Sequence, residues 1–142
     1  MDIHIRLAGG KKVDAEFGGF SIHTDQPPKY GGEDSAPSPF DVFLASIGTC
    51  AGYFIQNYCQ SRHLSTEGVE IVQHMDWDDA THLVKKIRLD IQVPEGFPEQ
   101  YRASLVSAVN LCTVKKHLKN PPEIEATTVV GSALPAPHPA AV

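Results

Sequence analysis

Three cysteines, Cys50, Cys59 and Cys112, are the residues of this sequence best suited to carry chemistry. A deprotonated thiol is a nucleophile that attacks peroxides and disulfides. Cys50 and Cys59 lie in one apolar stretch, at a spacing that on an intact helix puts them half a turn out of phase and ~13 Å apart along the axis. A disulfide needs Cα atoms within roughly 7 Å, so these two cannot pair without unwinding the helix. Cys112 lies in a different predicted helix, so it could meet Cys50.

Each cysteine also has a simpler interpretation, as a small buried hydrophobic residue without chemistry. Both interpretations stay open for Cys50 and Cys112, whereas the structural one is favoured for Cys59. The histidines are scattered, and His117, beside two lysines, is explained equally well by a solvated basic helix end. The sequence contains no C-x-x-C, H-x-x-H, G-x-S-x-G or phosphate-binding glycine motif, so we expect neither a metal ion nor a bound cofactor.

Residues 38–63 must form the element that positions Cys50. Ser38, followed by an acidic residue three positions later, forms a capping pattern, and Pro39 suits the first helical position. At about 100° per residue, an apolar arc surrounds Cys50. Its members are Phe43, Leu44, Ile47, Ala51, Phe54, Ile55 and Tyr58. We therefore expect a long buried helix with Cys50 inside its apolar side and Cys59 on the opposite side.

The other predicted elements are short strands and a second helix. Alternating apolar residues predict three antiparallel strands within residues 3–25 and a hairpin over residues 69–93. Residues 25–39, rich in Pro and Gly, predict an ordered loop before the long helix. A second helix is predicted from Pro98 through Cys112 to the Asn-Pro-Pro sequence at 120–122, and residues 124–130 predict a last strand.

The composition is that of one globular domain. The chain has 142 residues, 42% hydrophobic and 20% charged, from which we expect a single domain over residues 1–130 and a Pro/Ala-rich tail over residues 131–142. A net charge of -5 without a basic block argues against a nucleic-acid partner. Polar residues within 38–63 argue against a membrane span. The N-terminus lacks the order of a signal peptide, so we expect a cytoplasmic protein, in which thiols stay reduced.

Two motifs resemble the OsmC/Ohr family of thiol-dependent hydroperoxide reductases. One is P-x-x-x-x-L-A-S-I-G-T-C, ending at Cys50, with L-C-T-V-K-K-H-L around Cys112. The other is the D-x-P-x-x-x-G-G-x-x-x-x-P-S-P approach that begins at Asp25. The similarity spans about residues 20–130. It implies an α+β fold in which antiparallel sheets wrap around a long central helix, and an intertwined homodimer with its sites at the subunit interface.

The resemblance also implies residue roles. Cys50 would be the thiol that reacts with a small organic hydroperoxide, and Cys112 the resolving thiol that forms a disulfide with it. An external dithiol would then reduce the disulfide, in a protein that protects against oxidative stress. Aromatic side chains would form the apolar substrate pocket: Phe40, Phe43, Phe54 and Tyr58.

The sequence departs from the family at the group that activates the thiol. The peroxidase branch has a Glu directly after the Pro that starts the helix, and an Arg in the N-terminal strands. Here Phe40 stands at the Glu position, and Arg6 is the candidate activating residue. Two other hypotheses stay open: a protein that binds a small hydrophobic ligand around Cys50, and a redox sensor without efficient turnover.

Overall fold

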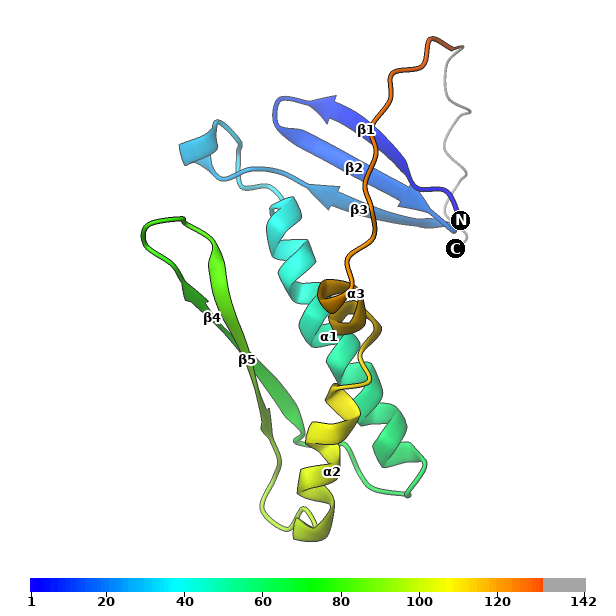
Figure 1. Ribbon diagram of the computed structural model, residues 1–142, viewed down its shortest axis with the longest axis vertical. Coiled ribbons are helices and arrows are strands. Elements are labelled where there is room, and N and C mark those ends of the chain that lie inside the picture. The colour runs from blue at the N-terminus through cyan, green and yellow to red at the C-terminus, as the bar shows by residue number, and fades with distance from the viewer. Residues whose placement is uncertain (132–142) are drawn as a thin grey trace. The chain divides into compact units, whose positions relative to one another are not determined.

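The computed structural model describes residues 1–131, which form two compact units of an α+β protein with antiparallel sheets (Figure 1). One unit comprises Met1–Phe43 together with the described part of Ile124–Val142, and the other comprises Leu44–Glu123. The predicted tail lies almost entirely outside the described residues, and the assignment of residues 1–130 to one domain stays a prediction.

The first unit is built on a sheet of three antiparallel strands, in the order β1 (His4–Gly9), β2 (Lys12–Phe17) and β3 (Phe20–Thr24). Gly18 and Gly19, both with positive φ (55° and 83°), make the two-residue turn that pairs Phe17 with Phe20. Both φ angles are costly for residues with a side chain, so the Gly-Gly sequence sets the register of this hairpin. The three predicted strands are confirmed.

A buried carboxylate organises the loop that precedes the long helix. Asp25 is 1% exposed and accepts hydrogen bonds from the backbone N–H groups of Gln26, Glu33 and Ser35, and from the Ser35 hydroxyl. The hydroxyl bond and the backbone bonds lower the pKa of Asp25 to about 2, since each favours the ionised form. The loop, with a short 3-10 helix η1 (Pro28–Tyr30), is therefore ordered, as predicted.

The long helix α1 (Pro39–Gln60) begins where the capping pattern predicts. The backbone N–H of Asp41 donates to the Ser38 hydroxyl, and the Asp41 carboxylate accepts from the Ser38 N–H. These reciprocal bonds satisfy groups that the first helical turn leaves without partners.

In the second unit, a hairpin and two helices pack with α1. The hairpin joins β4 (Glu70–Trp77) to β5 (Val84–Gln92), and the helices are α2 (Glu99–Val109) and α3 (Thr113–Lys119) (Figure 1). The core consists of Ala51, Ile55, Cys59, Phe97, Leu105 and Val109, with Ile71, Leu89 and Ile91 of the hairpin packed against it.

Two sequence-based expectations about the helices are corrected here. The predicted second helix is two helices, because the backbone turns at residues 110–112 and Cys112 becomes the N-cap of α3. The buried face of α1 runs through Leu44, Ile47, Ala51, Ile55 and Cys59. Its centre lies about a third of a turn from Cys50, at about 100° per residue. Cys59, expected opposite the apolar side, is therefore a core residue with 0% exposure.

The strand predicted over residues 124–130 is not formed. These residues have no regular structure, and Ile124, Val129 and Val130 are 88%, 83% and 101% exposed. A strand requires a neighbour to satisfy its backbone hydrogen bonds, and this segment pairs with neither sheet in the described chain.

Candidate functional site: a hydrogen-bonded pair of thiols

The structure brings Cys50 and Cys112 together within the second unit. The two side chains are close enough for a hydrogen bond between their sulfurs to act on both pKa values. Cys50 is partly exposed, whereas Cys112 is fully buried at 0% exposure. Both are free thiols in this structure. The two cysteines that the sequence singled out for chemistry are therefore neighbours.

The break between α2 and α3 positions Cys112. Its backbone is extended, with φ -50° and ψ 124°, and its sulfur accepts the backbone N–H of Lys115 at 3.4 Å. The Lys115 ammonium in turn donates to the Asn110 side-chain oxygen at 2.8 Å, on the other side of the turn. One residue thus holds the turn by two bonds, and the turn holds the Cys112 sulfur beside α1.

Burial and hydrogen bonding move the pKa values of the two thiols in opposite directions. Burial raises the pKa of Cys50, but the bond from Cys112 and the backbone N–H groups of Val114 and Thr113 outweigh it, so the pKa falls below its ordinary value. Burial raises the pKa of Cys112, and its own bond to Cys50 raises it further, because ionisation would remove the donated proton. Of the two thiols, Cys50 is therefore the one whose pKa favours ionisation.

The third cysteine has the opposite environment. Cys59 lies in the core of the second unit, and burial raises its pKa. A protonated, fully buried thiol is a poor nucleophile, which agrees with the structural interpretation of this residue. His117, the histidine near Cys112, donates from Nδ1 to the Thr113 carbonyl of its own helix at 2.8 Å.

The other predicted site residues divide between the two units. Arg6 pairs with Glu16 at 3.1 Å in the first unit, and Phe40 and Phe43 stack there with ring centroids 5.6 Å apart. Their role at the thiols stays a prediction. The other two aromatic residues of the predicted pocket, Phe54 and Tyr58, lie in the second unit and are partly buried. Phe54 packs edge-on against Tyr53, and Tyr58 packs against Tyr101 beneath the Arg62 guanidinium.

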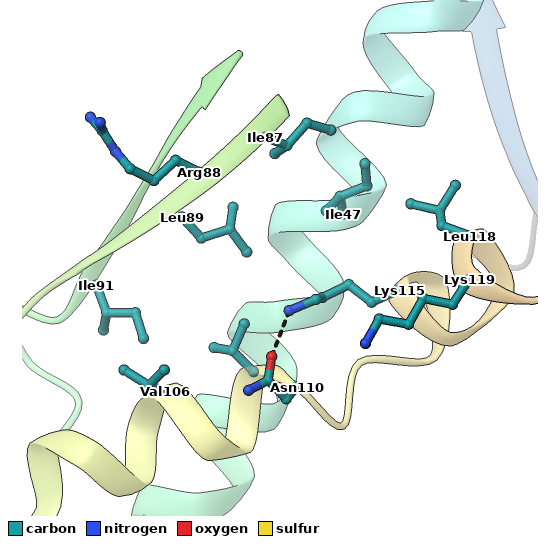
Figure 2. A pocket seen from close by; sticks show the side chains of 11 residues that line it. Ile47, Ile87, Arg88, Leu89, Ile91, Val106, Asn110, Lys115, Leu118 and Lys119 are labelled. Atoms are coloured by element: carbon teal, nitrogen blue, oxygen red, sulfur yellow. Dashed lines mark hydrogen bonds between the residues drawn. The ribbon is translucent and has the colours of Figure 1, made fainter. Parts of the chain in front are cut away.

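An apolar cavity that the sequence-based reasoning missed lies in the second unit. It has a volume of about 440 Å³ (Figure 2). Its walls come from α1, β5, α2 and α3: Ile47, Ile87, Arg88, Leu89, Ile91, Val106, Val109, Asn110, Lys115, Leu118 and Lys119. Ile47 precedes Cys50 by one helical turn, and Lys115 is the residue that bonds the Cys112 sulfur. The alternating apolar residues of β5 and the helices were predicted from the sequence, but the packing of the helices against that strand was not.

Other kinds of site are not found in the described residues. No group of three or more His, Cys, Asp or Glu side chains there could hold a metal ion. No helix among residues 1–131 is both long enough and apolar enough to cross a membrane.

Solved structures share this fold at low sequence identity. A proposed osmotic stress induced and detoxification response protein from Psychrobacter arcticus matches with a TM-score of 0.66 and 19% identity, over 80% of this chain and 85% of the other. The organic hydroperoxide resistance protein OsmC of Legionella pneumophila matches with a TM-score of 0.53 and 19% identity, over 84% and 90%.

A proposed organic hydroperoxide resistance protein from Vibrio cholerae, with captopril bound in one of its active sites, matches with a TM-score of 0.54 and 14% identity, over 85% and 86%. No curated protein matches the sequence significantly. The family model of the OsmC-like proteins matches residues 32–127, which include α1, both sheet-forming strands of the second unit and the thiol pair. The chain therefore belongs to the OsmC-like protein family.

Proposed function

We propose that this protein reduces organic hydroperoxides, with Cys50 as the reacting thiolate and Cys112 as the resolving thiol. The observation that carries this proposal is that the partly exposed Cys50 and the buried Cys112, both free thiols, lie close enough to act on each other's pKa. Such a pair has a nucleophile that a peroxide can reach and, beside it, a second thiol to close the disulfide.

The proposed reaction has two chemical steps in the protein. The Cys50 thiolate attacks one peroxide oxygen, the O–O bond breaks, and the alkoxide takes up a proton from solvent and leaves as an alcohol. Cys50 is then a sulfenic acid. The Cys112 sulfur attacks the Cys50 sulfur, the S–O bond breaks, and the hydroxyl group leaves as water with the Cys112 proton. The peroxide gains two electrons, and the two cysteines lose two in forming the disulfide.

The cavity supports an organic peroxide over hydrogen peroxide. Its walls are mostly aliphatic, and it begins one helical turn from Cys50, so it suits the alkyl or aryl part of a substrate. The names of the proteins from Legionella pneumophila and Vibrio cholerae refer to organic hydroperoxide resistance. The aromatic pocket of Phe40, Phe43, Phe54 and Tyr58 remains part of this proposal.

The proposed cycle requires an external reductant and a compartment that supplies it. An external dithiol reopens the Cys50–Cys112 disulfide by exchange: its two thiols become one disulfide, and both cysteines regain their thiols. A reducing cytoplasm provides such dithiols.

We further propose that the working form is a homodimer, in which a second copy covers apolar surface that one chain leaves exposed.

A single-turnover assay tests the proposal. Reduced protein is mixed with one equivalent of cumene hydroperoxide, and both the peroxide and the free thiols are titrated. Wild-type protein should lose two thiols per peroxide. Cys50→Ser should consume none, because a serine hydroxyl is far too weakly acidic to replace the thiolate. Cys112→Ser should complete one turnover and then over-oxidise at Cys50, because no second thiol traps the sulfenic acid.

Cys59→Ala is the matched control, since it removes a cysteine from the same helix without touching the pair. It should behave as wild type in this assay. If Cys50→Ser consumes the peroxide as fast as wild type, the proposal is wrong, and binding of a small hydrophobic ligand becomes the leading hypothesis. If thiols are lost but excess dithiol does not sustain turnover, the protein is a redox sensor.

A further inference from the structure

We propose that the apolar cavity of the second unit binds amphipathic carboxylates, and that Lys115 and Lys119 of α3 hold the carboxylate group. The aliphatic walls explain the binding of an apolar chain, but they do not explain the cations beside them. Three of the residues that line the cavity are cationic, and in the described chain none of its lining residues is acidic. A cavity with apolar walls and charges of one sign is suited to a ligand that has an apolar chain and the opposite charge.

The three cations differ in the partners they already have. The Arg88 Nε atom donates to the Asp90 carboxylate at 3.0 Å, so its charge is already paired. The Lys115 ammonium donates only to a neutral group, the side-chain oxygen of Asn110, at 2.8 Å. Among residues 1–131, Lys119 takes part in no ion pair. Two ammonium groups at the cavity are therefore available to a carboxylate that comes from outside the chain.

The two lysines lie together on α3. They are four residues apart, which places them on the same side of the helix. In Figure 2 both side chains extend from α3 in the same direction, toward Asn110. A carboxylate is a stronger acceptor for an ammonium group than a neutral amide oxygen. A ligand carboxylate can therefore replace the Asn110 oxygen at Lys115 and bind Lys119 as well.

The remaining walls suit the apolar chain of such a ligand. The cavity has a volume of about 440 Å³, which lies in the range of small-molecule sites. Two apolar side chains of its lining, Val106 and Leu118, are 57% and 48% exposed. They mark an open side, through which an alkyl chain can enter and then cover apolar surface that is now in contact with water.

The proposed carboxylate site adjoins the thiol pair. The backbone N–H of Lys115 donates to the Cys112 sulfur at 3.4 Å, so one residue contacts both the resolving thiol and the cavity. Here the inference rests on the proposed function and adds a selectivity to it. Lys115 and Lys119 would favour hydroperoxides that carry a carboxylate over neutral ones of the same size.

Binding of three ligands with the same alkyl chain tests the inference. Decanoate, decanol and decylammonium are titrated into the reduced full-length protein by isothermal calorimetry, at concentrations at which none of them forms micelles. Decanoate should bind about tenfold more tightly than decanol, the effect of one charge-assisted contact, and decylammonium should bind most weakly. The preference for decanoate should shrink as salt is added, because the lysines are not fully buried.

Lysine-to-methionine variants assign the preference to particular residues, because methionine keeps an apolar side chain and removes the charge. Lys119→Met should weaken decanoate binding about threefold, since Lys119 is exposed. The double variant Lys115→Met/Lys119→Met should bind decanoate no better than decanol. Unchanged decanol binding would show that its cavity is intact. Lys116→Met is the matched control, because it removes a charge from the same helix at a residue that does not line the cavity.

Three results would overturn the inference. One is equal affinity of the wild-type protein for decanoate and decanol. Another is a loss in Lys116→Met as large as in Lys119→Met, which would indicate a general effect of the positive charge of α3. The third is no binding of any of the three ligands, the result expected if a second copy of the chain fills the cavity.

The titrations use no peroxide, so this inference and the proposed function fail separately. If decanoate binds as expected while Cys50→Ser still consumes peroxide, the carboxylate site stands and the reductase fails. If decanoate shows no preference while peroxide reduction depends on Cys50, the reductase stands without selectivity for carboxylates.

Discussion

The buried position of Cys59 leads to a prediction about stability that the sequence alone would have missed. Cys59 is 0% exposed and belongs to the core of the second unit with Ile55 and Leu105. Cys59→Ser buries a hydroxyl group that can no longer form hydrogen bonds with water. This should lower the free energy of unfolding by about 1–3 kcal/mol. A bond from the serine to the carbonyl one turn earlier, at Ile55, would bring the cost to the lower end of that range. Cys59→Ala loses the sulfur contacts and leaves a small void, at a cost of about 1–2 kcal/mol.

Urea unfolding followed by circular dichroism measures this effect. With a slope of about 2 kcal/mol per molar urea, a loss of about 1–2 kcal/mol lowers the unfolding midpoint by roughly 0.5–1 M in either variant, at unchanged slope. Single-turnover peroxide reduction should remain at the wild-type rate in both. A Cys59→Ser protein as stable as wild type would refute the placement of Cys59 in the core. A loss of turnover as large as in Cys50→Ser would refute the assignment of the reacting pair.

Two further predictions concern the first unit. The pKa of Asp25 is about 2 in the folded protein, below its ordinary value, so the stability it contributes is present above about pH 4 and is lost as the pH falls toward 2. Asp25→Asn should unfold at lower urea at pH 7 and lose less stability than wild type between pH 4 and 2; equal acid sensitivity in urea titrations would contradict this. The protein should be a dimer in size-exclusion chromatography with light scattering, because Ile5, Leu7 and Phe20 are 56%, 87% and 70% exposed on the sheet. Leu7→Asp should weaken the dimer, and a stable wild-type monomer at micromolar concentration would exclude the proposal.

Features set by neighbouring residues were predicted correctly from the sequence. The three antiparallel N-terminal strands, the Ser38 cap and the end of α3 before Pro121 each depend on the backbone preferences of a few consecutive residues. Hairpins, caps and proline stops are local, so their signals survive in one sequence without knowledge of the fold. The resemblance to the OsmC-like family likewise rested on short motifs, and the match over residues 32–127 confirms it.

Features that depend on tertiary packing could be established only from the structure. The apolar arc of α1 is broad enough to be buried in more than one direction, and only the contacts with α2 and the hairpin decided that Cys59 faces the core while Cys50 lies on the flank. The sequence around Cys112 continues a helical stripe, yet the chain turns there, because the turn buries the Cys112 sulfur and bonds it to Lys115. Residues 124–130 have the composition of a strand, and strand formation depends on a partner that composition does not specify. The sequence by itself thus determined the thiols, the local elements and the family, whereas tertiary packing decided which thiols are buried, which two are neighbours and in which direction the pKa of each moves.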